Sequence, residues 1–236
     1  MNPHECAAQP HRTAVRLIPM NESERRNLDA EVAGCAGSHQ ALLASLDELV
    51  VAGTIGSARA SLLPEWTVGH VLTHLARNAD ALTGMIDGAR IGEERVMYPS
   101  QEARNTDITN GATRPLSEMV DDLRRSVWRL EQAWASLDAD GWSGHGLAVM
   151  GRLPVVEFPW RRWREVEVHR LDLGLGYTWE HWPTEYVSSD LAHRSAQWLS
   201  DPHHTLPEEV ASAPDRQRLA WLLGRASGLT APAPSL

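Results

Sequence analysis

The sequence contains no lysine, so arginine supplies all 22 of its fixed positive charges. Arginine stays charged at any physiological pH and grips carboxylates through two parallel hydrogen bonds. The formal net charge is -9, and no basic run exceeds a few residues. Nucleic-acid binding needs a basic surface that displaces counterions, so that class of partner is excluded. The lack of lysine is typical of GC-rich codon usage and favours a high-GC source, such as an actinobacterium.

Cysteines and long apolar runs are also scarce. Cys6 and Cys35 are too few for a disulfide scaffold and show no metal-binding spacing. No stretch approaches the roughly 20 apolar residues that span a bilayer. The N-terminus lacks a hydrophobic run suited to a secretory signal. We therefore expect a soluble cytoplasmic protein without a membrane partner.

The 236 residues, 42% of them apolar, suffice for a substantial core. Residues 1–20 mix proline, histidine and arginine without a period, and we expect them to form a disordered extension. Met20 is then a candidate natural start. We predict a helical domain over residues 21–178 and a small C-terminal subdomain over 179–236.

Apolar residues at steps of three and four predict a mostly α fold. The first helix should span residues 23–50, with Cys35 on its buried stripe. Three further helices are predicted over 67–87, 116–137 and 157–173. The long connection at 93–114 lies between the predicted helices at 67–87 and 116–137 and is typical of an antiparallel four-helix bundle.

Shorter elements follow from turn signals and weaker periods. The glycine-rich residues 141–156 suggest a small hairpin. Helices are expected over 183–199 and 216–227. The C-terminal subdomain is therefore predicted to be α or α+β.

Two side chains on the fourth predicted helix have metal-ligand spacing. Glu165 and His169 are four residues apart, so their Cβ atoms should lie about 5 to 6 Å apart on one helix face. A glutamate and a histidine at this spacing more often lie on a solvated helix face than bind a metal. His74, however, lies among apolar residues of the second helix, where a histidine needs a partner. Together the three could hold one divalent metal and leave a position open. Asp172 could orient a ligand imidazole.

The spacing leaves two questions open. His70 and His74 are also four apart, so the pattern does not say which of them binds the metal. A buried histidine bonded to a backbone carbonyl is the commoner arrangement for either. Arg161, Arg162 and Arg164 form a short basic patch, which usually marks a solvated face but could contact a polar cofactor.

Three runs resemble those of mycothiol-dependent maleylpyruvate isomerases, a branch of the DinB-like metal-binding bundle superfamily. The resemblance covers residues 21–180. The Glu-Ala-Arg-Asn part of the second run is the most specific to this branch. The runs are 63–75 (LPEWTVGHVLTHL), 98–105 (YPSQEARN) and 163–174 (WREVEVHRLDLG).

The resemblance implies a DinB-like four-helix bundle in which His74, Glu165 and His169 bind zinc. It implies catalytic roles for Arg104 and for Arg225, which would clamp the two substrate carboxylates. Mycothiol would be the thiol cofactor, and the reaction would convert maleylpyruvate to fumarylpyruvate in gentisate degradation. A metal-bound thiol loses its proton, although a free thiol has a pKa of about 8.5.

Two other functions stay open at this point. The stretch between Trp198 and Gly224 is shorter than in the isomerases that the chain resembles, which favours a mycothiol S-transferase or thiol-exchange enzyme acting on another electrophile. The other possibility is a non-catalytic metal-binding module. The sequence does not indicate the native metal, the true substrate or the oligomeric state.

Overall fold

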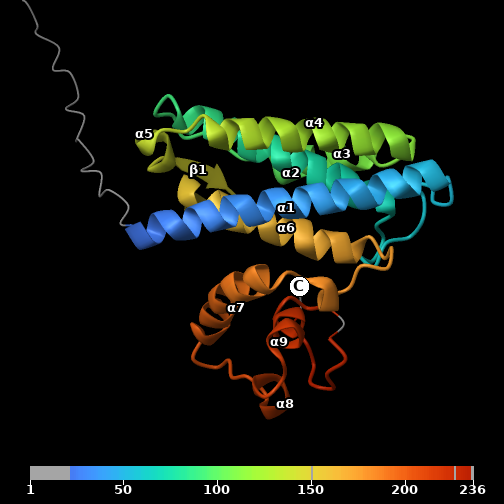
Figure 1. Ribbon diagram of the computed structural model, residues 1–236, viewed down its shortest axis with the longest axis vertical. Helices are drawn as coiled ribbons and strands as arrows, with labels where there is room; N and C mark the ends of the chain where they lie inside the picture. The colour runs from blue at the N-terminus through green and yellow to red at the C-terminus, as the bar shows by residue number, and fades with distance from the viewer. Residues whose placement is uncertain (1–21, 150, 226, 235–236) are drawn as a thin grey trace, which may run out of the picture.

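A computed structural model describes residues 22–149, 151–225 and 227–234. Its core is a bundle of four long helices with a smaller helical part beneath it (Figure 1). The bundle helices are α1 (Glu22–Ala52), α2 (Val68–Ala89), α4 (Leu116–Ala135) and α6 (Phe158–Asp172). This confirms the predicted mostly α bundle. The predicted extension over residues 1–20, and Met20, lie outside the described residues.

Helix α1 follows the predicted apolar stripe. Leu28, Cys35, Leu42 and Leu46 are all buried on the face that meets the other bundle helices. Burial also raises the pKa of the Cys35 thiol. As expected, Cys35 is a small core residue.

Residues 93–114 are not simply the predicted connection, because they contain α3 (Gln101–Gly111). The Ser100 hydroxyl caps this helix by accepting a hydrogen bond from the Ala103 backbone N–H at 3.0 Å. Ile108 is the one buried residue of α3. A helix with a single buried residue shows no apolar period, which is why the sequence pattern missed it.

The predicted hairpin is present. Strands β1 (His145–Ala148) and β2 (Gly151–Pro154) pair antiparallel between the short helix α5 (Ala139–Trp142) and the 3-10 turn η1 (Val155–Glu157). The hairpin sits at one end of the bundle and contacts α2 (Figure 1).

The C-terminal part lies against α6. The regular elements among its described residues are all helical. It holds the 3-10 turn η2 (Trp179–His181) and helices α7 (Thr184–Leu199), α8 (Glu208–Ala211) and α9 (Asp215–Leu222). The last helix ends earlier than the predicted residue 227. The division into domains at residue 178 stays a prediction.

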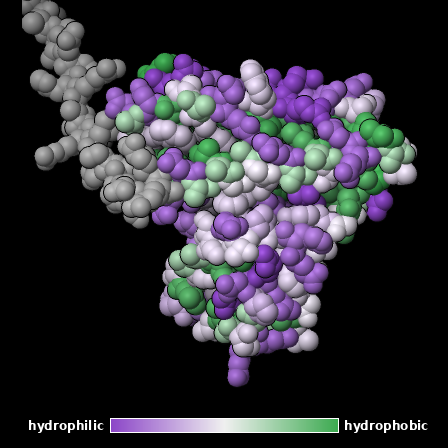
Figure 2. All heavy atoms as spheres, in the orientation of Figure 1, coloured by the Kyte–Doolittle hydropathy of each residue, from purple (hydrophilic) through white to green (hydrophobic). Residues whose placement is uncertain are grey.

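The space-filling view shows this part as a narrower lobe below the bundle (Figure 2). Hydrophilic and hydrophobic residues are mixed over the face in view, without one large apolar area. Among the described helices, none combines the length and apolar character needed to cross a bilayer.

Candidate metal centre

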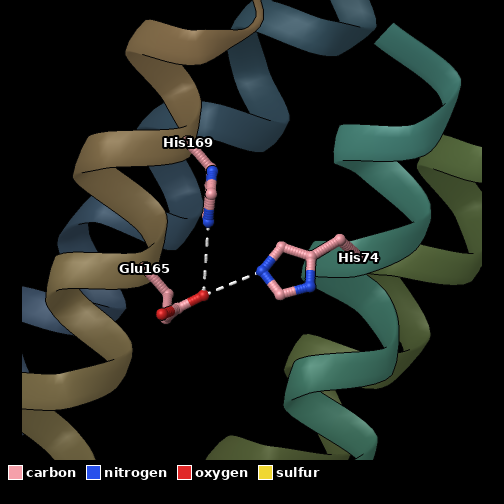
Figure 3. Close-up of side chains that lie close together, drawn as sticks. All are labelled: His74, Glu165 and His169. Atoms are coloured by element: carbon pink, nitrogen blue, oxygen red, sulfur yellow. Dashed lines mark hydrogen bonds and ion pairs between the residues drawn. The ribbon is translucent and has the colours of Figure 1, made fainter. Parts of the chain in front are cut away.

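Two bundle helices bring together the three side chains that the sequence singled out. His74 projects from α2, while Glu165 and His169 project from adjacent turns of α6, and all three point toward one another (Figure 3). His74 Nε2 lies 2.9 Å from Glu165 Oε2, and His169 Nε2 lies 3.4 Å from the same oxygen. One ligand atom from each residue falls within 4.8 Å of the others.

This donor set fits a divalent metal. A tetrahedral zinc ion with bonds of about 2.0 Å separates its ligand atoms by roughly 3.3 Å, close to the two distances from Glu165. Two imidazoles and a carboxylate also form a common three-ligand set of catalytic zinc sites, which keep a fourth position open. The three side chains are therefore suited to bind a zinc ion. That they do bind one is a proposal.

A hydrogen-bonded chain fixes the orientation of His169. Its Nδ1 lies 2.9 Å from Asp172 Oδ2, as expected for a group that orients a ligand imidazole. Arg225 donates to both oxygens of Asp172, from Nε at 2.7 Å and from Nη2 at 2.8 Å. Its Nη1 donates to the Leu223 carbonyl at 2.8 Å. Arg225, expected to clamp a substrate carboxylate, is thus bound to a carboxylate of this chain.

Arg104 lies on α3 and reaches the other histidine. Its Nη2 donates to His74 Nδ1 at 3.2 Å, and its guanidinium stands 5.8 Å from the centre of the Tyr98 ring. Because Nδ1 accepts this bond, the proton of neutral His74 is on Nε2, where it faces Glu165. A metal ligated by Nε2 requires the proton on Nδ1, so this bond from Arg104 and a metal at Nε2 exclude each other.

Burial and hydrogen bonding set the protonation of the three groups. Burial lowers the pKa of His74 to about 4, so His74 is neutral. Burial would also lower the pKa of His169, but its bonds to Asp172 and Glu165 outweigh this and raise that pKa to about 9. Burial alone would raise the pKa of Glu165, yet its bonds to both histidines hold that pKa well below its usual range. Without a metal, a histidinium therefore faces a carboxylate.

The structure also shows that His70 and His74 have different surroundings. His70 Nδ1 accepts from the Thr67 backbone N–H at 3.2 Å, and the Thr67 hydroxyl in turn accepts from the His70 backbone N–H at 3.4 Å. These two bonds form a capping box at the start of α2. His70 thus caps the helix, whereas His74 lies one turn further on in the cluster.

The predicted basic patch is only partly solvated. Arg162 is completely buried, contrary to the reading of a solvated face, whereas Arg161 and Arg164 are half-buried. No local signal separates Arg162 from Arg161, because the two lie three and four residues before Glu165 and both share its helix face. Three arginines within four positions are more typical of a surface patch.

Comparisons with known proteins point to one family. Residues 35–174 match the family model described as the mycothiol maleylpyruvate isomerase N-terminal domain. Crystal structures of the mycothiol-dependent maleylpyruvate isomerase and of a histidine-to-alanine mutant of it are each similar to the chain, with a TM-score of 0.70 and 27% identity over 89% of this chain and 96% of theirs. No curated protein matches the sequence. The family model covers more than half of the chain, which therefore belongs to the mycothiol maleylpyruvate isomerase N-terminal domain family.

Proposed function

We propose that this protein is a mycothiol-dependent maleylpyruvate isomerase that uses a divalent metal, best assigned as zinc. The observation that carries the proposal is the convergence of His74, Glu165 and His169 in a chain of this family. The similarity to the isomerase structure over nearly its whole length supports the substrate and the thiol. We further propose that the enzyme is cytoplasmic, as expected from the sequence.

When bound, the metal would supply an acidic position at which a thiol is held as thiolate. The cis double bond of maleylpyruvate accepts the sulfur, and the double-bond electrons move toward the neighbouring carbonyl. Rotation about the resulting single bond and loss of the sulfur give the trans product and return the thiolate. The reaction needs no redox partner, and the chain needs no cysteine of its own.

The chain's own residues would position the reactants. Arg104 lies beside His74 and would leave it when Nε2 becomes a ligand, so its guanidinium would be available for a substrate carboxylate. Arg225 would act differently from the expected clamp, since it holds Asp172 and through it His169. We propose Arg104 as the catalytic arginine and Arg225 as a positioning residue.

Calorimetric titration of mycothiol into the zinc-loaded protein, followed by an assay with maleylpyruvate, tests this function. We expect zinc-dependent binding that releases a proton, and turnover to fumarylpyruvate. His74→Ala should abolish both. Retained zinc without any thiol binding would refute a thiol-dependent activity and leave the metal-binding module.

A mycothiol S-transferase of the same fold is the second candidate. One observation favours it: the hydrogen bonds of Arg225 are directed to Asp172 and Leu223, which leaves the expected two-arginine clamp incomplete. Mycothiol binding without turnover of maleylpyruvate would favour this reading.

A further inference from the structure

A second feature adjoins the metal centre, on the side of Glu165 toward the hairpin. A cavity of about 330 Å³ lies between α2, α6 and the hairpin. Its size is within the range of small-ligand sites. Apolar side chains such as Leu82, Met85 and Phe158 form much of the wall, and Asn78, Arg162 and Glu165 contribute polar groups.

Arg162 is the unusual member of this wall, because its guanidinium is completely buried and has only neutral hydrogen-bond partners. Its Nη1 donates to the Leu75 carbonyl at 2.9 Å and to Asn78 Oδ1 at 2.8 Å, and its Nε donates to His39 Nε2 at 3.1 Å. The remaining nitrogen, Nη2, is buried and has no hydrogen-bond partner among the described residues. Burial lowers the pKa of Arg162, although arginine still keeps its charge.

The two other arginines that line the cavity, unlike Arg162, have carboxylate partners. Arg161 donates to Glu157 Oε2 from Nε at 3.0 Å and from Nη2 at 2.6 Å. Arg164 donates to both oxygens of Asp190 from Nε, at 2.8 and 3.0 Å. Each therefore has a carboxylate partner, whereas Arg162 has none in direct contact.

A buried charge without a counterion is costly, and proteins normally pair it. Glu165 and Asp80 act on Arg162 from a distance, but Asp80 is already paired with Arg77 and Arg129. Glu131 reaches Arg162 only through His39. A divalent metal at Glu165 would engage the negative charge of Glu165. The cavity would then hold a net positive charge beside an unpartnered N–H, which favours an anionic ligand.

We infer that this cavity is a carboxylate-binding subsite in which the Arg162 guanidinium, covered in this structure, turns toward the cavity so that Nη2 receives one carboxylate of the substrate. The inference rests on the proposed function and deepens it, because Arg162 takes the second clamping role that the family resemblance implies for Arg225. A guanidinium–carboxylate bond is a strong, charge-assisted one. The apolar wall suits the carbon chain of a small unsaturated dicarboxylate.

The test uses maleate, a small cis-dicarboxylate, and its uncharged diamide as probes. Each is titrated into the zinc-loaded full chain without mycothiol. Wild-type protein should prefer maleate to the diamide. Arg162→Met should weaken maleate binding at least tenfold and leave diamide binding unchanged. Arg170→Met is the matched control, since Arg170 lies on the same helix outside the cavity and should leave maleate binding unchanged.

A second variant covers the case in which Arg162→Met does not fold. Asn78→Asp has nearly the same shape and places a carboxylate against Arg162 Nη1, so it supplies the missing counterion from within. It should also weaken maleate binding about tenfold while zinc content stays the same. Unchanged maleate affinity in the variants that fold would overturn the subsite.

Turnover separates this inference from the proposed function. If the wild type isomerises maleylpyruvate, Arg162→Met should raise KM at least tenfold with an unchanged Kd for mycothiol. An unchanged KM would overturn the subsite and leave the isomerase standing. If the wild type shows no turnover, the isomerase fails, and the maleate titration alone then decides whether Arg162 binds carboxylates.

Discussion

At the scale of single residues, Asp172 is the link between the metal centre and the C-terminal part. It contacts His169 Nδ1 at 2.9 Å and receives two hydrogen bonds from Arg225. Because such a carboxylate orients a ligand imidazole, Asp172→Asn should weaken zinc binding by about 10- to 100-fold. Competition with a chromophoric chelator measures this affinity. Asp201→Asn, at a half-exposed position in a loop, is the control, and an equal zinc affinity in both variants would refute the orienting role.

The raised pKa of His169 gives the metal site a definite pH dependence. A metal at Nε2 must displace one proton as long as the pH is below the His169 pKa of about 9, while Glu165 is already ionised and His74 already neutral. The zinc association constant should therefore rise about tenfold per pH unit from pH 6 to 8.5. Competition titrations across this range check the slope, and a flat profile would contradict the assignment.

The same shift should appear in the stability of the metal-free protein. His169 has a pKa of about 9 in the folded chain against 6.5 for an ordinary histidine, so the protonated form stabilises the fold below pH 6.5. That contribution, up to about 3 kcal/mol, should be lost as the pH rises from 6.5 to 9. Urea unfolding of the metal-free wild type and of His169→Gln checks this: the decline should be absent in the variant.

The residue pattern predicted part of this site. The Glu165–His169 spacing is local, so it could be read along one helix. The choice of His74 over His70 required the family resemblance, and the structure adds that His70 caps α2. The placement of Arg162 and Arg225 depends on contacts between distant parts of the chain, such as Arg162 with Leu75, and no local pattern encodes these.

At the scale of elements, two glycines of α1 have the same helix propensity but differ in how they pack. Both Gly34 and Gly37 lower helix propensity, and the sequence alone treats them alike. A Cβ at position 34 would lie 2.2 Å from the Trp163 ring of α6, whereas nothing lies within 4 Å of one at position 37. Gly34 therefore permits the close approach of α1 and α6.

This contrast predicts opposite effects of one substitution. Gly34→Ala should destabilise the protein by about 1 to 3 kcal/mol, because the indole is buried and the helices must separate. Gly37→Ala should stabilise it by about 0.5 to 1 kcal/mol through helix propensity. Denaturant unfolding of the two variants measures both changes. Equal effects would mean that the helices can shift at no cost.

Helix α3 marks the limit of prediction for elements. It carries Arg104, yet it buries little besides Ile108 and therefore lacks the apolar period on which the other helices were predicted. Ser100 at its start was the available signal, since serine is a preferred N-cap. The four bundle helices were predictable because each buries a full stripe.

At the scale of the whole molecule, several contacts join the C-terminal part to α6, and three of them are hydrogen-bonded. Arg225 binds Asp172, Arg164 binds Asp190 of α7, and the Trp182 indole N–H donates to the Glu167 carbonyl at 3.2 Å. The three α6 residues are next to, or within three positions of, the proposed ligands Glu165 and His169. The C-terminal part therefore supports the helix that carries two of the three ligands.

The Arg164–Asp190 pair allows this support to be tested. The Asp190 side chain is only 3% exposed and also accepts a hydrogen bond from the Tyr186 hydroxyl at 2.9 Å. Asp190→Asn would leave the half-buried Arg164 without its counterion, so we expect a loss of about 2 to 4 kcal/mol in unfolding free energy. The melting temperature should fall by about 5 °C or more, and zinc affinity should fall with it.

Asp215→Asn is the matched control for this last experiment. Asp215 also pairs with an arginine of the C-terminal part, Arg218, but its side chain is 62% exposed. Exposed pairs contribute little, so this variant should stay within about 0.5 kcal/mol of the wild type. If Asp190→Asn lowered stability but left zinc affinity unchanged, α6 would hold its ligands without help from α7. The C-terminal part would then support the fold and not the metal centre.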